Sequence, residues 1–346
     1  MADGIPLDPW QQITLSRQQV EAYLTRIQLP LSTLDEPPSH PLLAKLMQSQ
    51  LENIPKDTTP MHVEDWDGPS KPIKLSSVLK MPEGVEAFDR IVTENKGAFC
   101  FAVNPTFAAF LRFFGFRVSE LVGRTFKSLG NDPRTHPDGW KWGTLTHELM
   151  IADWEGSDAR YLVDAAWGPW GCPVPAKLSN GETVLGLNEY EAFKIVNEQL
   201  PLSPHQTPPI DTMPGWTFYR FIPPPNTPLS LPITDSTPGY WSPQFHFHLL
   251  SIPLLDYRLL HHFSATHEVG SFYAFWLVTR LLPGTGGARR SMMFAEKEGQ
   301  DVRRAKVYTT GGHEGKGSLD GRNVEWVSME TGPMREYLER EFGYKF

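Results

Sequence analysis

The feature that most constrains this chain is an apolar run from Phe107 to Phe116, which follows closely on Cys100. The run is rich in phenylalanine, and Arg112 is its one charged residue. Such a run predicts a buried helix that ends near Gly115, and the rest of the chain must build a core around it. Cys100 then lies at or just before the helix N-terminus, where the positive end of the helix dipole favours a thiolate.

The start of this helix has two readings because of Pro105. Either the helix begins near Phe101 with Pro105 still in its first turn, or Asn104 caps a helix that begins at Pro105. Both readings keep Cys100 close to the helix N-terminus. The alternative to a reactive thiol is a buried structural cysteine, because free cysteine is among the most buried residue types.

Composition is typical of a packed globular protein. Of the 346 residues, 40% are hydrophobic and 12% aromatic, which suits two or three domains with a full core. The formal net charge of −8 argues against a broad nucleic-acid surface but is compatible with a local basic pocket. Two cysteines, Cys100 and Cys172, provide no disulfide framework, which is typical of a reducing compartment. Without a secretory pattern or an 18-residue apolar run, we expect a cytoplasmic protein with no membrane partner.

Hydrophobic patterning divides the chain into three stretches. The first, up to about residue 118, is mostly helical in pattern, with helices predicted at 16–24 and 41–47. The second alternates as strands do, at 117–124, 149–154, 160–164 and 217–221, with a hairpin turn at 155–158. The third is mixed: it predicts a helix over 333–343 and leaves 271–280 open between a buried strand and a helix.

His147 and Asp164 lie at similar distances on either side of the predicted hairpin turn. Antiparallel pairing of the two strands therefore sets their side chains roughly opposite one another. Together with Cys100 they can supply a nucleophile, a base and an orienting group for acyl transfer. Taken alone, such a histidine is more often a core residue and such an aspartate a turn residue. The chemistry requires all three groups to meet in a pocket open to solvent.

Three motifs, in order along the chain, resemble those of the arylamine N-acetyltransferases. The family's Arg-Gly-Gly-x-Cys segment with a following asparagine is similar to residues 96–104. Its Thr-His-x-Leu strand is similar to residues 146–149, and its Tyr-Leu-Val-Asp-x-Gly-Phe-Gly segment to residues 161–168. Weaker similarities near residues 23–27 and 256–272 extend the resemblance along most of the chain.

The resemblance implies an α+β fold with a cysteine-protease-like core. In this fold, residues 1–118 form a helical domain that carries the nucleophile, 119–239 a β-barrel domain that carries the histidine and aspartate, and 240–346 an α/β lid domain. The implied activity is a ping-pong N-acyltransferase of the xenobiotic-detoxification type. Cys100 would take an acetyl group, or another short acyl group such as malonyl, from acyl-CoA and pass it to an arylamine or hydrazine. His147 would activate the thiol and Asp164 would orient the imidazole.

The same resemblance suggests further contacts with the two substrates. Phe99, Phe126 and Trp167 are assigned to the amine site, although Trp167 is equally explained by packing under the barrel. Thr146, Ser271 and Arg289 are assigned to acyl-CoA, although a plain basic hairpin turn also explains Arg289. No metal is expected, because His246 and His248 are not accompanied by a further metal-binding motif.

The chain departs from the family pattern close to the nucleophile. The family arginine is Lys96, its second glycine is Ala98, and its Ile-Pro-Phe-Glu-Asn segment reads Ile-Pro-Lys-Asp-Thr at residues 54–58. Since the glutamate and arginine pair in relatives, we predict an Asp57–Lys96 pair of shorter reach, without a bidentate fork. The long segment 124–143 lies either beside the active site, where it would shape the choice of amine, or in solvent.

Two other functions are compatible with these residues. A cysteine hydrolase or transglutaminase-like enzyme would use the same triad with water or a peptide amine as acceptor. A catalytically silent binding homologue is conceivable because of Lys96 and Ala98. The acyl group, the natural amine and the oligomeric state are open.

Overall fold

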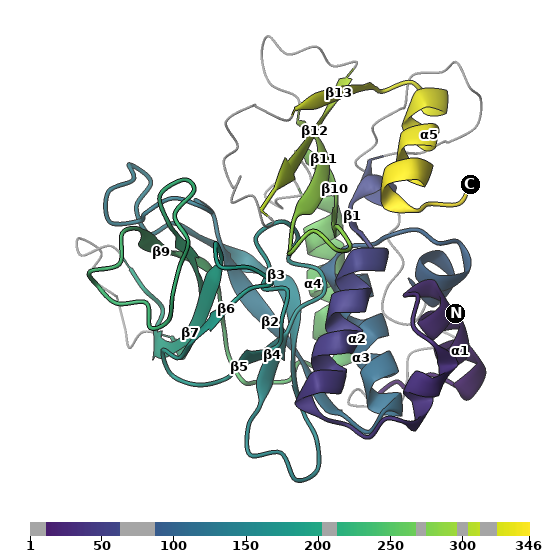
Figure 1. Cartoon of the computed structure of the whole chain (residues 1–346), viewed down its shortest axis with the longest axis horizontal. Coiled ribbons are helices and arrows are strands. Elements are labelled where there is room, and N and C mark those ends of the chain that lie inside the picture. Colours follow the sequence, from purple (N-terminus) through teal and green to yellow (C-terminus); the bar gives the residue numbers. More distant parts are fainter. Residues whose placement is uncertain (1–11, 63–86, 203–212, 268–274, 296–303, 312–323) are drawn as a thin grey trace.

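A barrel, a second sheet and a layer of helices are arranged around one junction (Figure 1). The computed structural model describes residues 12–62, 87–202, 213–267, 275–295, 304–311 and 324–346. The mixed helix-and-sheet architecture with a barrel-like sheet confirms the predicted fold class. Within these described residues, no helix is long and apolar enough to cross a membrane.

The described residues form five α-helices, and all but the fourth overlap helices predicted from the sequence. They are α1 (Arg17–Arg26), α2 (His40–Asn53), α3 (Cys100–Phe113), α4 (Leu254–Thr266) and α5 (Thr331–Phe342), with single turns at Leu31–Asp35, Thr59–Met61 and Asp89–Thr93. Ser16 caps α1 through a capping box, and Pro41 stands in the first turn of α2. Gly343 ends α5 with a φ of 72°, a left-handed conformation that glycine adopts without strain.

The barrel is a nearly closed eight-stranded antiparallel sheet with the order β5-β4-β3-β2-β9-β8-β7-β6. Its strands are β2 (Arg117–Phe126), β3 (Trp142–Asp153), β4 (Tyr161–Val163), β5 (Ala176–Lys177), β6 (Thr183–Leu185), β7 (Ala192–Gln199), β8 (Pro214–Ile222) and β9 (Tyr240–Phe247). β9 begins just past residue 239, where the third domain was expected to start, yet it pairs with β2 and β8 inside the barrel. The barrel therefore takes its last strand from the beginning of the third stretch of the chain.

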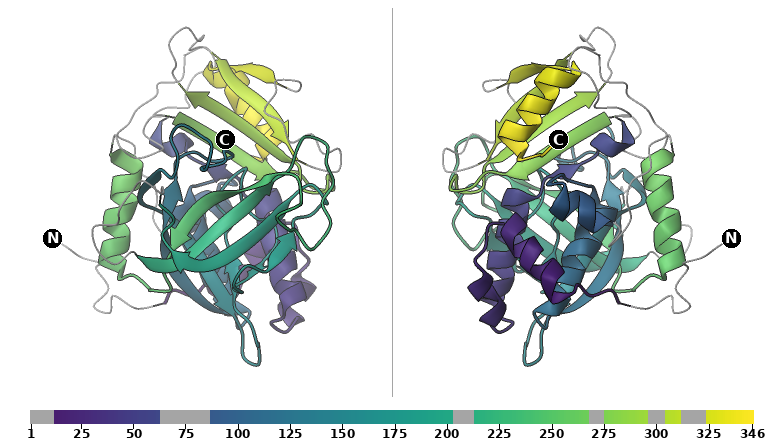
Figure 2. Two further views of the ribbon diagram at one scale, coloured as in Figure 1. Left: turned by 90° about the vertical axis from the view of Figure 1, so that its left-hand side faces the viewer. Right: turned by 90° about the vertical axis from the view of Figure 1, so that its right-hand side faces the viewer.

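The second sheet has five antiparallel strands in the order β1-β10-β11-β12-β13. They are β1 (Lys56–Asp57), β10 (Phe275–Leu281), β11 (Arg289–Ala295), β12 (Arg304–Thr310) and β13 (Glu325–Ser328). The open choice for 271–280 is thus settled as a strand over its described part. α5 covers one face of this sheet, while α4 lies apart from it beside the helical layer (Figure 2). β1 comes from the helical stretch, so it joins the first and third parts of the chain.

Side-chain alternation along β3 separates two hydrophobic cores. Leu149 and Ile151 point into the barrel core, whereas Met150 and Ala152 point outward into the core formed with the helices. α3 packs on this outer face, next to β2 and β3, and its residues up to Leu111 are buried. The buried helix predicted from the apolar run is confirmed, and it lies against the strand that carries His147.

Candidate active site

Cys100 is the first residue of α3, and Phe99 is its N-cap. This start is close to the first of the two readings, but Pro105 is the sixth helical residue and so lies beyond the first turn. The backbone N–H groups of a first helical turn have no partner within the helix, and their partial positive charge is directed at this end. The local structure therefore favours negative charge at the Cys100 sulfur.

The structure brings Cys100, His147 and Asp164 together. Nε2 of His147 lies 2.6 Å from Oδ2 of Asp164, and the imidazole also hydrogen-bonds the Cys100 side chain. Because Nε2 contacts Asp164, Nδ1 is the ring nitrogen that can hydrogen-bond the thiol. The Cys100 sulfur also lies 3.9 Å from the carbonyl oxygen of Thr146. This is the order nucleophile, imidazole, carboxylate that acyl transfer through a thiol requires.

The β3–β4 hairpin sets the distance between His147 and Asp164. Met150 pairs with Val163, so Asp164 stands one residue beyond β4 and two positions out of register with His147. The two side chains are therefore diagonal neighbours and not directly opposite, a separation that long side chains span. The expectation of roughly opposite positions is met to within this offset.

The protonation of the pair follows from burial and mutual charge. Burial alone would lower the pKa of His147, but the carboxylate of Asp164, its hydrogen bond and the Cys100 side chain raise that pKa to about 9. Burial would raise the pKa of Asp164, yet the imidazole and the donors around the carboxylate hold it below the ordinary value. An imidazolium beside an ionised aspartate is therefore the favoured state, and it hydrogen-bonds the Cys100 side chain.

Asn104 holds Asp164 in place from one helical turn beyond Cys100. Its amide nitrogen lies 3.2 Å from Oδ1 of Asp164 and 2.6 Å from the carbonyl oxygen of Glu148. Its amide oxygen accepts the backbone N–H of Ala165 at 2.9 Å. Asn104 belongs to the motif at residues 96–104, but no positioning role was predicted for it. Its spacing of four residues from Cys100, which places both on one helix face, is the signal that points to it.

Lys56 is a second residue that the sequence reading did not place at the site. It lies in β1, is 7% exposed, and its ammonium donates to the carbonyl oxygen of Trp167 at 3.1 Å. Burial lowers the pKa of Lys56, while the charges of Cys100 and Asp164 act against that effect. Gly168, with a φ of +92°, leaves room for the side chain, since a Cβ there would stand 3.1 Å from Cδ of Lys56. The site thus contains a lysine where the family segment has phenylalanine.

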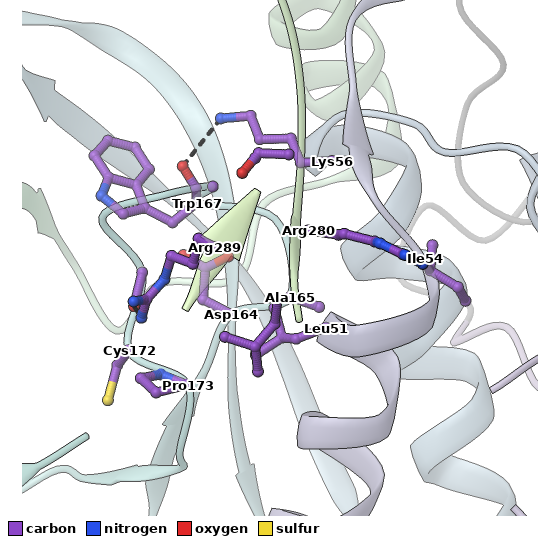
Figure 3. Close-up of a pocket in the computed structure, with 14 residues that line it drawn as sticks. Leu51, Ile54, Lys56, Asp164, Ala165, Trp167, Cys172, Pro173, Arg280 and Arg289 are labelled. Atoms are coloured by element: carbon purple, nitrogen blue, oxygen red, sulfur yellow. Dashed lines mark hydrogen bonds between the residues drawn. The ribbon is translucent and has the colours of Figure 1, made fainter. Parts of the chain in front are cut away.

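The expected opening to solvent is wrong for this structure. Cys100 is fully buried, and the cavity on the Asp164 side of the triad, lined by Lys56, Asp164 and Trp167 among others, has a volume of about 20 Å³ (Figure 3). Such a space holds about one water molecule. The thiol nonetheless has two polar neighbours, the His147 imidazole and the Thr146 carbonyl. Reaction with a substrate therefore requires movement of the groups around the thiol.

The residues assigned to the amine site lie in different places. The Trp167 indole packs edge-on against the His147 imidazole with ring centroids 4.5 Å apart, and its N–H donates to Gln244. Phe99 is buried against Phe101 and His261, directly before the nucleophile.

Phe126 lies farther along the barrel, against the rings of Trp140 and Trp142. It pairs in register with Trp142, five residues from His147 along β3, which corresponds to roughly 16 Å. The loop between β2 and β3 also packs on the barrel here, because Gly130 hydrogen-bonds Ser242 and Tyr240.

The residues assigned to acyl-CoA are also spread out. Thr146 lies beside the thiol through its carbonyl, and its hydroxyl donates to Thr144. Arg289 is 3% exposed, and its guanidinium forms an ion pair with Glu191 and donates to the carbonyl of Gly171. The guanidinium is thus held inside the protein, between the two sheets. Ser271 lies outside the described residues.

The predicted Asp57–Lys96 pair is wrong. Asp57 pairs with Arg90 at 2.8 Å, and Nε of Arg90 also donates to the carbonyl of Gly97 at 2.8 Å. Lys96 pairs instead with Glu94 at 3.0 Å. The physical reason is reach and shape, because a guanidinium fork can serve a carboxylate and a carbonyl at once whereas an ammonium is a point charge. The arginine beneath the active site has come from a different element.

His246, one of the two histidines considered as metal ligands, is explained by packing. His246 is buried in β9, and its Nδ1 pairs with the Thr217 hydroxyl at 2.9 Å. Burial lowers the pKa of His246 to about 4. Within the described part of the chain, no three histidine, cysteine or acidic side chains are grouped as metal ligands.

Residues 42–310 match the N-acetyltransferase family model. A curated relative, the N-malonyltransferase FDB2 of Fusarium pseudograminearum, is 24% identical over 286 residues, which cover 77% of this chain and 75% of that protein.

Solved structures with the same fold include arylamine N-acetyltransferases of two bacteria. The Salmonella typhimurium enzyme is 18% identical and has a TM-score of 0.63. The alignment covers 96% of this chain and 92% of the Salmonella chain. The Mycobacterium marinum enzyme in complex with CoA is 18% identical and has a TM-score of 0.60. The alignment covers 94% of this chain and 92% of the Mycobacterium chain. Since the family model spans well over half of the sequence, the chain is an acyltransferase-type enzyme that belongs to the arylamine N-acetyltransferase family.

Proposed function

We propose that the protein is an acyl-CoA-dependent N-acyltransferase that works through a thioester on Cys100. The observation that carries this proposal is the contact of His147 with both Cys100 and Asp164, at 2.6 Å on the aspartate side, within a member of this family. His147 is the base and acid of the reaction, and Asp164 keeps its ring oriented. Asn104 is a positioning residue that acts through Asp164.

The first half-reaction transfers the acyl group to the enzyme. The Cys100 thiolate attacks the thioester carbonyl of acyl-CoA, a new C–Sγ bond forms, and the bond from the carbonyl carbon to the CoA sulfur breaks. His147 gives its proton to the departing CoA thiolate. In the second half-reaction an amine nitrogen attacks the same carbonyl, the C–Sγ bond breaks, and the imidazole takes the proton from nitrogen.

The choice of substrates rests on similarity and chemistry. One structural neighbour binds CoA, and the curated relative is an N-malonyltransferase, so the donor is an acyl-CoA with a short acyl group, acetyl or malonyl. The acceptor is an arylamine or a hydrazine, whose unprotonated nitrogen attacks a thioester without prior deprotonation. We place the reaction in the cytoplasm as part of detoxification, with Trp167 and Phe99 on the amine side and Thr146 on the donor side.

The test compares acceptors. The full-length enzyme is incubated with acetyl-CoA or malonyl-CoA, with and without an aniline, and both released CoA and N-acylated product are measured. A transferase forms the N-acyl product and releases CoA slowly when amine is absent. Rapid CoA release with free acid as the product, amine or no amine, would indicate a hydrolase instead.

A silent homologue is distinguished by the thiol itself. Iodoacetamide should modify Cys100 faster at neutral pH than it modifies a small-molecule thiol, because the imidazolium stabilises the thiolate. The variant Cys100→Ser should lose this fast modification while Cys172 reacts as before. Slow modification together with no acyl transfer would contradict the proposal.

A further inference from the structure

A lysine is buried next to the nucleophile, where the family segment has an aromatic residue. Lys56 lies in β1, and this strand reaches the site through its bridge to Ala98, two residues before Cys100. The side chain is held by the Trp167 carbonyl and lies over the Trp167 indole, 5.7 Å from the ring centroid. The cation is therefore fixed by the same tryptophan that packs on the catalytic imidazole.

Two other cations line the same small cavity, and their surroundings differ. Arg289 is held by Glu191, as described above. Figure 3 shows the Lys56 ammonium reaching toward Trp167, whereas the Arg280 side chain extends to the opposite side, toward Ile54. Lys56 thus shares the cavity with Asp164, and its backbone is bridged to Ala98, two residues before Cys100.

The balance of charge changes when Cys100 carries an acyl group. Burial disfavours the charged form of Lys56, and the negative charges of Cys100 and Asp164 oppose that penalty. Acylation turns the thiolate into a neutral thioester and so removes one of these two negative charges. A carboxylate at the far end of the acyl group would restore a negative charge close to the Cys100 sulfur. An acyl group ending in a methyl offers no such compensation.

We propose that Lys56 makes this site selective for acyl donors whose acyl group ends in a carboxylate, malonyl-CoA being the smallest common case. The inference rests on the proposed function, because it names the donor for the same thioester chemistry. In the malonyl thioester the carboxylate carbon stands two bonds from the carbonyl carbon on sulfur, and Lys56 is the group that recognises it. Lys56 acts on the substrate here and takes no part in proton transfer.

The test measures initial rates of Cys100 acylation by intact mass with three donors. The acyl group of malonyl-CoA ends in a charged carboxylate. That of isovaleryl-CoA has nearly the same shape but no charge, and that of acetyl-CoA has neither the charge nor the branched end. The wild type should load malonyl fastest. In Lys56→Met the ratio of malonyl to isovaleryl loading should fall roughly tenfold or more, because a buried charge partner is lost. Lys56→Arg, which keeps the charge, should retain most of the preference.

Lys194→Met is the matched control. Lys194 is also a lysine over a tryptophan, 4.3 Å from the Trp241 ring centroid, but it lies on the barrel and not at the triad. Its loss should leave the donor ratio unchanged. If Lys56→Met does not fold, the wild-type comparison of malonyl-CoA with isovaleryl-CoA still decides, since equal rates contradict selectivity for charge.

Two outcomes separate this inference from the proposed function. If wild-type Cys100 is acylated by all three donors at similar rates, or if Lys56→Met slows all three equally, the thioester chemistry stands and the selectivity is overturned. An equal loss would mean that Lys56 acts on the thiol alone. If no donor adds mass to Cys100, the proposed function itself fails, and the inference fails with it.

Discussion

The Tyr257 hydroxyl of α4 donates the hydrogen bond that the backbone of Pro105 cannot donate within α3. Proline has no backbone N–H, so the carbonyl of Phe101, four residues earlier, loses its donor within the helix. The Tyr257 hydroxyl donates to that carbonyl, and its ring packs edge-on against Phe101 at 5.1 Å. α4 is therefore tied to the first turn of the helix that begins at Cys100.

This relationship predicts a double-mutant result. Tyr257→Phe leaves a buried carbonyl without a donor and should lower the free energy of unfolding by about 1–3 kcal/mol. In a Pro105→Ala background the new N–H at residue 105 can bond the Phe101 carbonyl, so the same change should cost much less. Denaturant unfolding of the four proteins measures the difference. Tyr161→Phe, at a tyrosine whose described contacts are with the rings of Trp154 and His40, is the control. Equal costs of Tyr257→Phe in both backgrounds would argue against the relationship.

Asn104→Ala should reduce acyl transfer more than it reduces stability. Without the amide, Asp164 loses a donor and the imidazole loses its fixed partner, so we expect kcat to fall roughly ten- to a hundredfold. Asn53→Ala is the matched control, because Asn53 is also buried and bonds the backbone carbonyls of Ile27 and Ser49. Stability should drop in both variants, with kcat largely kept in Asn53→Ala. Similar kcat values for Asn104→Ala and Asn53→Ala would contradict the positioning role of Asn104.

Glu148 makes the fold sensitive to alkaline pH. It is fully buried on the α3 side of β3, and neither carboxyl oxygen has a hydrogen-bond partner among the described residues. Burial first, and then the nearby charges of Glu120, Cys100 and Asp164, raise the pKa of Glu148 well above 4.5. The folded protein thus binds this proton more tightly than the unfolded chain. The corresponding stability is complete below the unfolded pKa and is lost as pH rises toward the folded one.

Glu148→Gln should therefore stabilise the protein at pH 8 and change little at pH 5, because glutamine cannot ionise. The measurement is the difference in Tm between variant and wild type across that range. Glu182→Gln, at an exposed side chain, should show no pH-dependent difference. A difference that stays constant with pH would mean that Glu148 does not titrate in the expected direction.

Glu191 joins the barrel to the second sheet. It lies just before β7 and accepts from Arg220 of β8 and Arg289 of β11, at 2.8 and 2.5 Å. Glu191→Gln leaves two buried guanidinium groups without their anion and should cost about 3–5 kcal/mol of unfolding free energy. The exposed Lys177–Glu182 pair at 3.7 Å serves as the comparison, where loss should cost less than about 1 kcal/mol. Equal costs at the two sites would contradict a joining role.

Local patterns were sufficient for the elements that carry the triad. The apolar run predicted α3, and the turn signal at 155–158 predicted the β3–β4 hairpin that brings His147 to Asp164. These predictions depend on contacts close in sequence, where periodicity and turn chemistry act directly. The last barrel strand was harder, because β9 pairs with β2 across more than a hundred residues and nothing local indicates that pairing.

Partners at the active site were the least predictable part. Matching charges suggested Asp57 with Lys96, but Arg90 reaches Asp57 because a π-helical turn at Asp89–Thr93 places it there. The position of Lys56 at the active site was not predictable because a two-residue strand has no periodicity. Its neighbours Trp167 and Gly168 also lie more than a hundred residues away in the sequence. Such tertiary contacts depend on how elements pack, which composition and spacing do not determine.

The central claim is that Cys100 carries the acyl group during turnover. Its most direct test is intact mass of the wild-type enzyme after brief exposure to malonyl-CoA or acetyl-CoA, followed by addition of an aniline. The account predicts a gain of one acyl group that maps to the peptide containing Cys100, is absent in Cys100→Ser, and disappears as the N-acyl amine forms. An unmodified wild-type protein that still produces the N-acyl amine would contradict it.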